Sequence, residues 1–466
     1  MSAAPHILRG AWVMPISGPP IPHGEVVLQG DRIVSVRPAT SEAGPGVEDF
    51  GDAILLPGLV NVHTHLDYTV MRGLLEDLEF FPWIRELTAR AMTLTPEDWL
   101  ASAMWGAVEA VAGGVTTLGD CTFSGAAFEA ARVFGLGGII YREVFGIDEL
   151  RTVDVIVAEL RDSVERMCAL TPGPHLRAGI SPHAPYTVRP ALLRALADYA
   201  GDCGLPLCIH AAESQAEAQL LRSGTGPFAD MYVRRSIDWH APGGSTVAYL
   251  DSLGIVTERT LLVHGVQVSA GDRALVQQRG AAWAHCPKSN AKLGAGVAPL
   301  GILLGRCPTE TGSGHGRVGL GSDSVASNNT MDLFEEIRFA VLLQRGARRQ
   351  IAAFGTREAV EMATLGGARA LGMEAEIGTL EPGKRADICV VGLGAPHSFP
   401  AYDPYSALVY ASRASDVLAT YIGGEPRYDA RLGPSPEDRF LRNDIAPIRQ
   451  QLGNAARKMS EWRPAT

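Results

Sequence analysis

From residue 54 onward, short apolar runs rich in Val, Ile and Leu alternate with stretches long enough to form a helix. This alternation is typical of βα units, in which helices cover a parallel sheet. The runs lie at 54–62, 115–119, 138–145, 176–181, 205–210, 260–265, 281–286 and 317–322. Eight strands are the number that closes a (β/α)₈ barrel, so the pattern predicts an α/β fold of that class.

Helical periodicity fills several of the intervals between these runs. Pro96 begins a predicted helix at 96–112, in which apolar residues recur four positions apart. A similar apolar spacing predicts a helix at 189–203. Two more helices are predicted at 330–345 and 356–372.

The two ends of the chain have a different pattern. Residues 6–53 and 377–428 alternate apolar and polar positions between Gly and Pro, which indicates strands and turns. We therefore predict a small β domain from both ends. The expected divisions are 1–56 and 373–428 for that domain, 57–372 for the barrel and 429–466 for a helical tail, with a loop at 307–316.

Composition narrows the class of protein. Hydrophobic residues make up 46% of the chain and charged residues 20%, and no apolar run reaches the roughly 20 residues that span a bilayer. The formal net charge of −10 disfavours nucleic acid as a partner. Seven scattered cysteines form no CxxC pair, which argues against a disulfide framework. These features predict a cytoplasmic enzyme for a small molecule, with no membrane partner.

Polar residues follow the predicted barrel strands, where barrel enzymes place their chemistry. Histidines follow five of the eight strands, whereas a lone histidine in such a place is more often an ordinary core residue. In chain order the residues are His63 and His65, Arg142 and Glu143, His183, His210 and Glu213, His264, His285, and Asp323.

The sequence "HTH" at the end of the first strand suggests a metal. Residues i and i+2 of a strand share a face, so His63 and His65 can point at one ion. Together with His210 and Asp323 they make a ligand set that suits one Zn²⁺ or Fe²⁺ and leaves a position open for water. Such an ion lowers the pKa of bound water toward neutrality.

A set of motifs in this order resembles the amidohydrolase superfamily, in particular its branch of methylthioadenosine/S-adenosylhomocysteine deaminases, other adenosine-derivative deaminases and triazine hydrolases. The motifs are "PGLVNVHTHLDYTVMRG", "SPHAPYT", "IHAAES", "LLVHGV", "HCPKSNAKLGAGVAPL" and "GLGSDSVASNNTMDLFEEIR". The resemblance implies a metal-dependent barrel with a β-sandwich built from both termini. It also implies one metal, because His183 stands where members with two metals carry a lysine.

The resemblance also implies catalytic roles. Glu213 would carry a proton to the substrate ring, Asp323 would take a proton from the attacking water, and His264 would orient that water. His183 would contact the substrate, whereas His285 would orient a loop. For Arg142 two roles stay open: a substrate contact or an ion pair with Glu143.

The segment 75–84 is expected to form a lid, with Phe80, Phe81 and Trp83 against the substrate or in the core. Adenosine-derivative deaminases tend to carry a ribose-binding glutamate just before this Trp, where the chain has Phe81 and Pro82. Either Glu79 substitutes for it or the substrate lacks a ribose.

Three functional hypotheses follow. The first is a deaminase for an adenosine derivative such as methylthioadenosine, S-adenosylhomocysteine or aminodeoxyfutalosine. The second is a deaminase or dechlorinase for a free heterocycle such as guanine, a pterin or an s-triazine. The third is a barrel scaffold without activity, which should have lost metal ligands. The resemblance also favours a homodimer.

Overall fold

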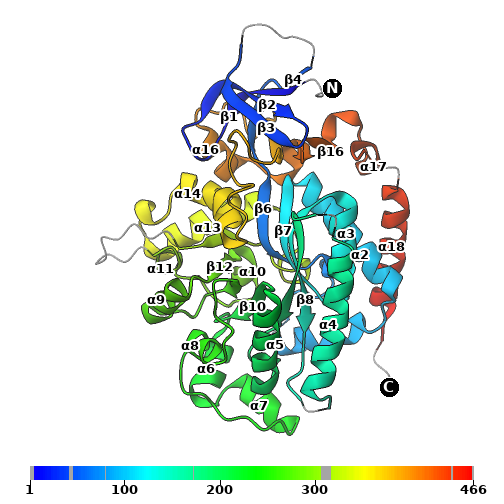
Figure 1. Cartoon of the computed structure of the whole chain (residues 1–466), viewed down its shortest axis with the longest axis vertical. Coiled ribbons are helices and arrows are strands. Elements are labelled where there is room, and N and C mark those ends of the chain that lie inside the picture. Colours follow the sequence, from blue (N-terminus) through cyan, green and yellow to red (C-terminus); the bar gives the residue numbers. More distant parts are fainter. Residues whose placement is uncertain are drawn as a thin grey trace.

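The computed structural model describes residues 5–40, 46–78, 80–148, 150–171, 173–305, 316–441 and 444–463. Most of the predicted loop at 307–316 therefore lies outside the described residues. Within the described ranges the chain forms a parallel barrel and a second, mixed sheet (Figure 1).

The barrel sheet consists of eight strands among the described residues, and neighbouring strands are parallel. A bridge between Thr64 and Asp323 joins its first and last strands. The predicted (β/α)₈ barrel is confirmed. Its strands are β6 (Leu59–Thr64), β7 (Val115–Thr122), β8 (Gly137–Val144), β9 (Leu176–Pro182), β10 (Leu207–Ala211), β11 (Thr260–His264), β12 (Ala282–His285) and β13 (Val318–Leu320).

The second sheet combines strands from both ends of the chain, and β5 lies at its centre. β1 pairs with β5 in parallel and β14 pairs with β5 antiparallel. The small β domain is thus confirmed. The strands are β1 (His6–Val13), β2 (Ile21–Gln29), β3 (Arg32–Pro38), β4 (Val47–Asp49), β5 (Ala53–Pro57), β14 (Ile388–Gly392), β15 (Val417–Ile422) and β16 (Glu425–Asp429).

The prediction of a single strand at 54–62 is wrong, because the run divides at Gly58 into β5 of the mixed sheet and β6 of the barrel. Gly58 packs closely on the next barrel strand: a Cβ atom there would lie 2.2 Å from Oγ1 of Thr116. Its N–H donates to the carbonyl of Asp387 at 2.8 Å. One apolar run therefore serves two sheets.

Helices surround the barrel, and α2 shows why they begin where they do. Thr95 and Asp98 form a capping box, and Pro96 occupies the first turn, where its missing N–H has no cost. The helices that follow strands or cover the barrel are α1 (Phe80–Ala91), α2 (Pro96–Ala112), α3 (Ala126–Phe134), α4 (Val153–Ala169), α5 (Pro190–Cys203), α6 (Gln215–Ser223), α7 (Pro227–Arg234), α8 (Thr246–Ser252), α9 (Ala270–Arg279), α10 (Pro287–Lys292), α11 (Leu300–Leu303), α12 (Val325–Asn328) and α13 (Leu333–Arg348).

The remaining helices lie toward the C-terminus. The helix predicted at 356–372 is interrupted by a π-helical turn at Met362–Gly366, between α14 (Thr356–Glu361) and α15 (Gly367–Ala370). α16 (Pro404–Ser406) and α17 (Pro436–Arg439) are short. The predicted helical tail contains α18 (Ile445–Glu461), which runs beside α2 (Figure 1) and is held there by Lys458 and Gln451, which both donate to the Asp98 carboxylate.

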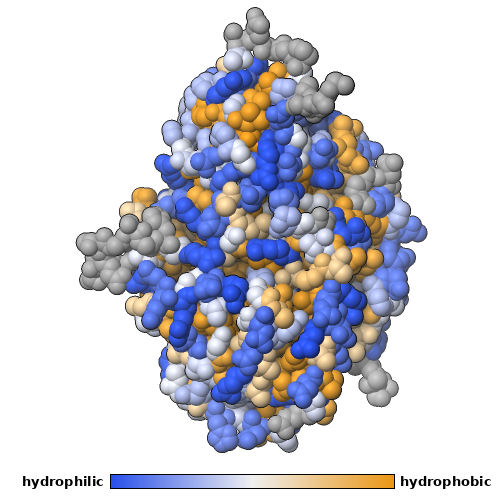
Figure 2. All heavy atoms as spheres, in the orientation of Figure 1, coloured by the Kyte–Doolittle hydropathy of each residue, from blue (hydrophilic) through white to orange (hydrophobic). Residues whose placement is uncertain are grey.

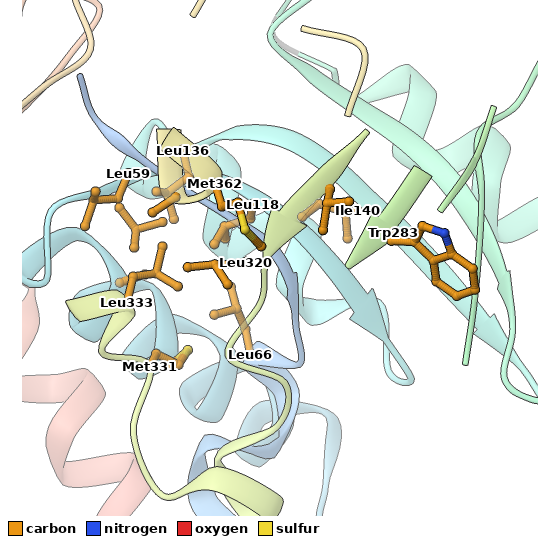
Figure 3. Close-up of a cluster of buried hydrophobic side chains, with 14 of the residues drawn as sticks. Leu59, Leu66, Leu118, Leu136, Ile140, Trp283, Leu320, Met331, Leu333 and Met362 are labelled. Atoms are coloured by element: carbon orange, nitrogen blue, oxygen red, sulfur yellow. The ribbon is translucent and has the colours of Figure 1, made fainter. Parts of the chain in front are cut away.

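The main apolar core lies between the barrel strands and the helices that cover them. Leu118, Ile140 and Leu320 come from barrel strands, and Leu333 comes from α13 (Figure 3). The outer surface mixes hydrophilic residues with smaller apolar patches (Figure 2). Among the described helices, none is both long enough and apolar enough to cross a membrane.

We predict that Leu118→Ala destabilises the barrel by about 3 kcal/mol, because the fully buried side chain leaves a cavity that the neighbouring strands cannot fill. The urea midpoint, followed by tryptophan fluorescence, measures the change. Leu342→Ala is the control, since that side chain is 51% exposed and its loss should cost less than about 0.5 kcal/mol. Equal effects of the two substitutions would contradict the packing described here.

Candidate metal centre and active site

Four side chains from three barrel strands meet at the carboxyl end of the barrel. His63 lies on β6, His65 directly follows that strand, His210 lies on β10, and Asp323 lies just beyond β13. One ligand atom from each of the four lies within 4.8 Å of the others, and all four residues are buried. The structure thus brings together the four residues that the sequence predicted as ligands.

The spacing of these atoms suits a cation better than hydrogen bonds. Asp323 Oδ1 lies 3.4 Å from Nε2 of His63 and 3.6 Å from Nε2 of His65. Zinc bonds of about 2.0–2.2 Å in a tetrahedral site place ligand atoms about 3.4 Å apart. His63 Nε2 is buried and has no hydrogen-bond partner among the described residues. The residues present therefore fit a divalent metal.

Hydrogen bonds outside the cluster aim the ligand atoms inward. His210 Nδ1 lies 2.7 Å from the carbonyl oxygen of His183 and must donate to it, which leaves Nε2 with its lone pair. Asp323 Oδ2 accepts from the hydroxyls of Ser289 at 2.6 Å and Ser327 at 3.0 Å. Asp323 Oδ1 is consequently the oxygen that faces the histidines.

Burial sets the charge of these groups. Burial, together with the neighbouring His63, lowers the pKa of His65 to about 3, and burial also lowers the pKa of His210. For His63, burial favours the neutral ring, but the negative charge of Asp323 close by outweighs it and raises the pKa to about 10. Although burial opposes its charge, Asp323 keeps a lowered pKa because His63 faces it. Asp323 is thus ionised and faces a positive charge on His63, which is the position where a divalent cation would supply that charge instead.

Glu213 and His264 form a second group beside the metal ligands. Glu213 follows β10, and its Oε1 lies 3.7 Å from Nε2 of His264 at the end of β11. The other oxygen accepts a long hydrogen bond from Tyr186 Oη, at 3.4 Å. His264 Nδ1 lies 2.9 Å from Oδ1 of Asn290, an acceptor, so Nδ1 carries the ring proton. The other ring nitrogen, Nε2, faces Glu213 with its lone pair. An acid–base pair is thus held next to the metal cluster.

The sequence reasoning missed Glu217, which fixes the turn that carries Glu213. Its carboxylate accepts the N–H of Ala212 at 2.8 Å, the N–H of Glu213 at 2.9 Å and the hydroxyl of Thr246 at 2.9 Å. Burial raises the pKa of Glu217 to about 7. The pattern Ser214-x-x-Glu217 at the start of α6 is a signal that could have identified it.

A cavity of about 690 Å³ opens over these groups. Its size falls in the range of small-molecule sites and admits a nucleoside. His65, His210, Asp323, Glu213 and His264 lie on its wall.

The predicted substrate residues have different positions. Trp83 and His183 line the cavity, as do Glu143 and Phe145. Glu79 lies outside the described residues, and so do the side chains of Phe80 and Phe81.

Neither role suggested for Arg142 agrees with its position. It is not among the residues that line the cavity, and its guanidinium donates to the carbonyl oxygens of Thr122 at 3.2 Å and Glu143 at 3.1 Å rather than to the Glu143 carboxylate. Neighbouring residues of a strand point to opposite faces, so Glu143 faces inward where Arg142 does not. His285 is buried without a hydrogen-bond partner among the described residues and does not line the cavity.

Comparisons with known proteins identify the family of this chain. Residues 54–427 match the model of the amidohydrolase family. A 5-methylthioadenosine/S-adenosylhomocysteine deaminase from Moorella thermoacetica is 33% identical over 434 residues, which are 90% of this chain and 93% of the relative. A zinc-bound adenosine deaminase from Xanthomonas campestris has a TM-score of 0.82 at 26% identity, covering 97% of this chain and 98% of its own. An atrazine chlorohydrolase from Arthrobacter aurescens in complex with zinc has a TM-score of 0.81 at 22% identity. The match covers 97% of this chain and 99% of the chlorohydrolase, which shares the fold.

We predict about one divalent metal ion per chain, and at least a tenfold loss of affinity in His65→Asn and in Asp323→Asn, because each variant loses one ligand. Elemental analysis after dialysis against a weak chelator measures the bound metal. His240→Asn is the control, since that side chain is 90% exposed. Retention of full metal by both ligand variants would refute the site.

Proposed function

This chain belongs to the amidohydrolase family and is a hydrolase that acts on C–N bonds, and on that premise we propose that it releases the 6-amino group of an adenosine derivative as ammonia. The observation that carries the proposal is the pairing of Glu213 with His264 beside the metal ligands. The relatives named as deaminases support it. Methylthioadenosine, S-adenosylhomocysteine and aminodeoxyfutalosine are the proposed type of substrate.

We propose that one divalent ion, Zn²⁺ in the first place and Fe²⁺ as the alternative, binds to His63, His65, His210 and Asp323. When bound, such an ion acidifies water and thereby supplies the nucleophile of a hydrolysis. The remaining work falls to side chains of the chain itself.

The protons move through two carboxylates. Asp323 accepts a proton from the attacking water, and Glu213 donates a proton to the ring nitrogen next to the attacked carbon, so that the ring can accept the electron pair. His264, oriented by Asn290, holds the water by a hydrogen bond and stabilises the charge that develops on its oxygen. Asp323 then passes its proton to the departing amino group, which leaves as ammonia. The remaining hydroxyl proton on the attacked carbon returns to Glu213 as the carbonyl forms, so both carboxyl groups regain their starting states.

The substrate lies in the cavity between Trp83 and His183. Apolar residues such as Ile84, Leu87 and Met231 also line the cavity and suit an apolar substituent of the substrate. Glu79 and Phe81 stay proposed contacts. A free heterocycle is the second candidate, because Phe81 and Pro82 stand where adenosine-derivative deaminases tend to carry a ribose-binding glutamate.

We expect Glu213→Gln to lower kcat by about a thousandfold or more, because the amide cannot donate and regain the proton. Metal content should stay unchanged, since Glu213 is not a ligand, and elemental analysis checks this. Glu129→Gln, a surface residue paired with Arg132, should keep full activity. Turnover by Glu213→Gln at the wild-type rate would exclude Glu213 as the proton carrier.

Ammonia release from the metal-loaded protein tests the substrate. The panel contains adenosine, methylthioadenosine, S-adenosylhomocysteine, aminodeoxyfutalosine, adenine, guanine, a pterin and an amino-triazine. We expect the highest kcat/KM for a 5′-substituted adenosine. Turnover restricted to the free bases or the triazine would support the second candidate instead.

A further inference from the structure

Glu143 is a buried carboxyl group on the wall of the cavity for which the mechanism above has no use. The residue is 4% exposed and lies near the end of β8. Neither of its carboxyl oxygens has a hydrogen-bond partner among the described residues. Burying an unpaired carboxyl group costs stability, so its position calls for a partner that binds in the cavity.

The groups around Glu143 locate it beside the metal ligands. Its register partner on β9 is Ser181, and His183 lies two residues further along the chain, just beyond that strand. One polar atom from each of Glu143, His183 and His210 lies within 4.8 Å of the others. Phe145, the next residue of the chain that lines the cavity, stacks on the ring of His183 at 4.6 Å.

A second metal is a poor explanation for this group. His210 donates Nδ1 to a backbone carbonyl and has only one lone pair left, which the cluster with His63, His65 and Asp323 uses. Glu143 and His183 alone would offer two ligands, fewer than a stable protein site provides.

His183 next to it is also an acceptor. Its Nδ1 lies 2.8 Å from Oγ1 of Thr187, and that hydroxyl donates its only proton to the carbonyl of Ala184. Nδ1 must therefore donate, and Nε2 keeps its lone pair. Glu143 and His183 together form a polar patch that can accept hydrogen bonds from a bound molecule.

We propose that Glu143 is a substrate-binding and specificity-determining residue whose carboxyl group accepts a hydrogen bond from a hydroxyl or amino group of the substrate. The inference rests on the proposed deamination. As a carboxylate the group accepts such a bond at either oxygen, and as a carboxylic acid it still accepts at its carbonyl oxygen. In an adenosine derivative the donor is a ribose hydroxyl, and in a free heterocycle it is a second amino group.

The test combines a protein change with a substrate change. Wild type, Glu143→Gln and Glu143→Leu are compared on adenosine against 2′-deoxyadenosine and 3′-deoxyadenosine, and on adenine against 2,6-diaminopurine. The wild type should prefer the compound with the extra donor by about 10- to 100-fold in kcat/KM for one of these pairs. In Glu143→Leu the ratio of the two kcat/KM values should fall to about one. The variant lacks the acceptor, so the extra donor of the substrate no longer gains a hydrogen bond. Glu143→Gln, which keeps an acceptor, should retain part of it.

Stability and metal content separate this role from a structural one. Removing an unpaired buried carboxyl should leave the Tm of Glu143→Leu equal or higher, whereas a structural role predicts a lower Tm. The matched control is Glu25, which is equally buried but pairs with Arg9 and Arg37 in the mixed sheet. Glu25→Leu should lower Tm and leave the substrate ratios unchanged.

The outcomes distinguish the two proposals. If the wild type releases ammonia neither from these compounds nor from the substrate panel above, the proposed function fails, and the same ratios are then measured as dissociation constants. Equal ratios in wild type and Glu143→Leu, by either measure, overturn the role of Glu143. A loss of bound metal in Glu143→Leu would also overturn it, since Glu143 would then be a ligand.

Discussion

The closure of the barrel is the constraint on which the rest of the site depends. Thr64, at the end of β6, pairs with Asp323, which lies just beyond β13 and 259 positions further along the chain, and the backbone N–H of Asp323 donates to the carbonyl of His63 at 2.9 Å. The seam that closes the sheet therefore also joins metal ligands of the first and last strands. Because the ligand set exists only in the closed barrel, a bound cation would stabilise that closed state over any open one.

Strain in the backbone marks the strand ends that carry the chemistry. Ala212, His264 and Asp323 have φ values of 55°, 76° and 59°, in the left-handed region that non-glycine residues rarely adopt. Each of these residues lies at the end of a strand or just beyond it, and the side chains of His264 and Asp323 line the cavity. Hydrogen bonds hold these turns, such as those from Ala212 and Glu213 to Glu217. Such conformations cost about 1–3 kcal/mol each and persist only where the surrounding structure fixes them.

The sequence predicts the barrel well, because strands buried on both faces read as continuous apolar runs. It also indicates that His63 and His65 share one face of their strand by the i, i+2 rule, and in the structure they meet His210 and Asp323. The continuous apolar character of these runs also hides the features that the sequence prediction missed. In a run that is apolar throughout, nothing shows that Gly58 divides two sheets, or that Glu143 rather than Arg142 faces inward. The hydroxyl of Ser289 reaches Asp323 from α10, 34 positions away in the chain, and no local sequence pattern indicates such a contact.

The two sheets treat buried charge in opposite ways. In the mixed sheet, buried Glu25 receives two arginines, so its desolvation is offset within the chain. At the carboxyl end of the barrel, by contrast, His63 Nε2 and both oxygens of Glu143 are buried with no hydrogen-bond partner among the described residues. Selection for stability alone would remove such groups, since each costs free energy in the folded state. The apolar barrel core offsets that cost, and the missing partners are of the kind that a cation and a polar substrate supply. These groups are the ones that the proposed metal and substrate would pair with, so ligand binding and stability of the fold would draw on the same interactions.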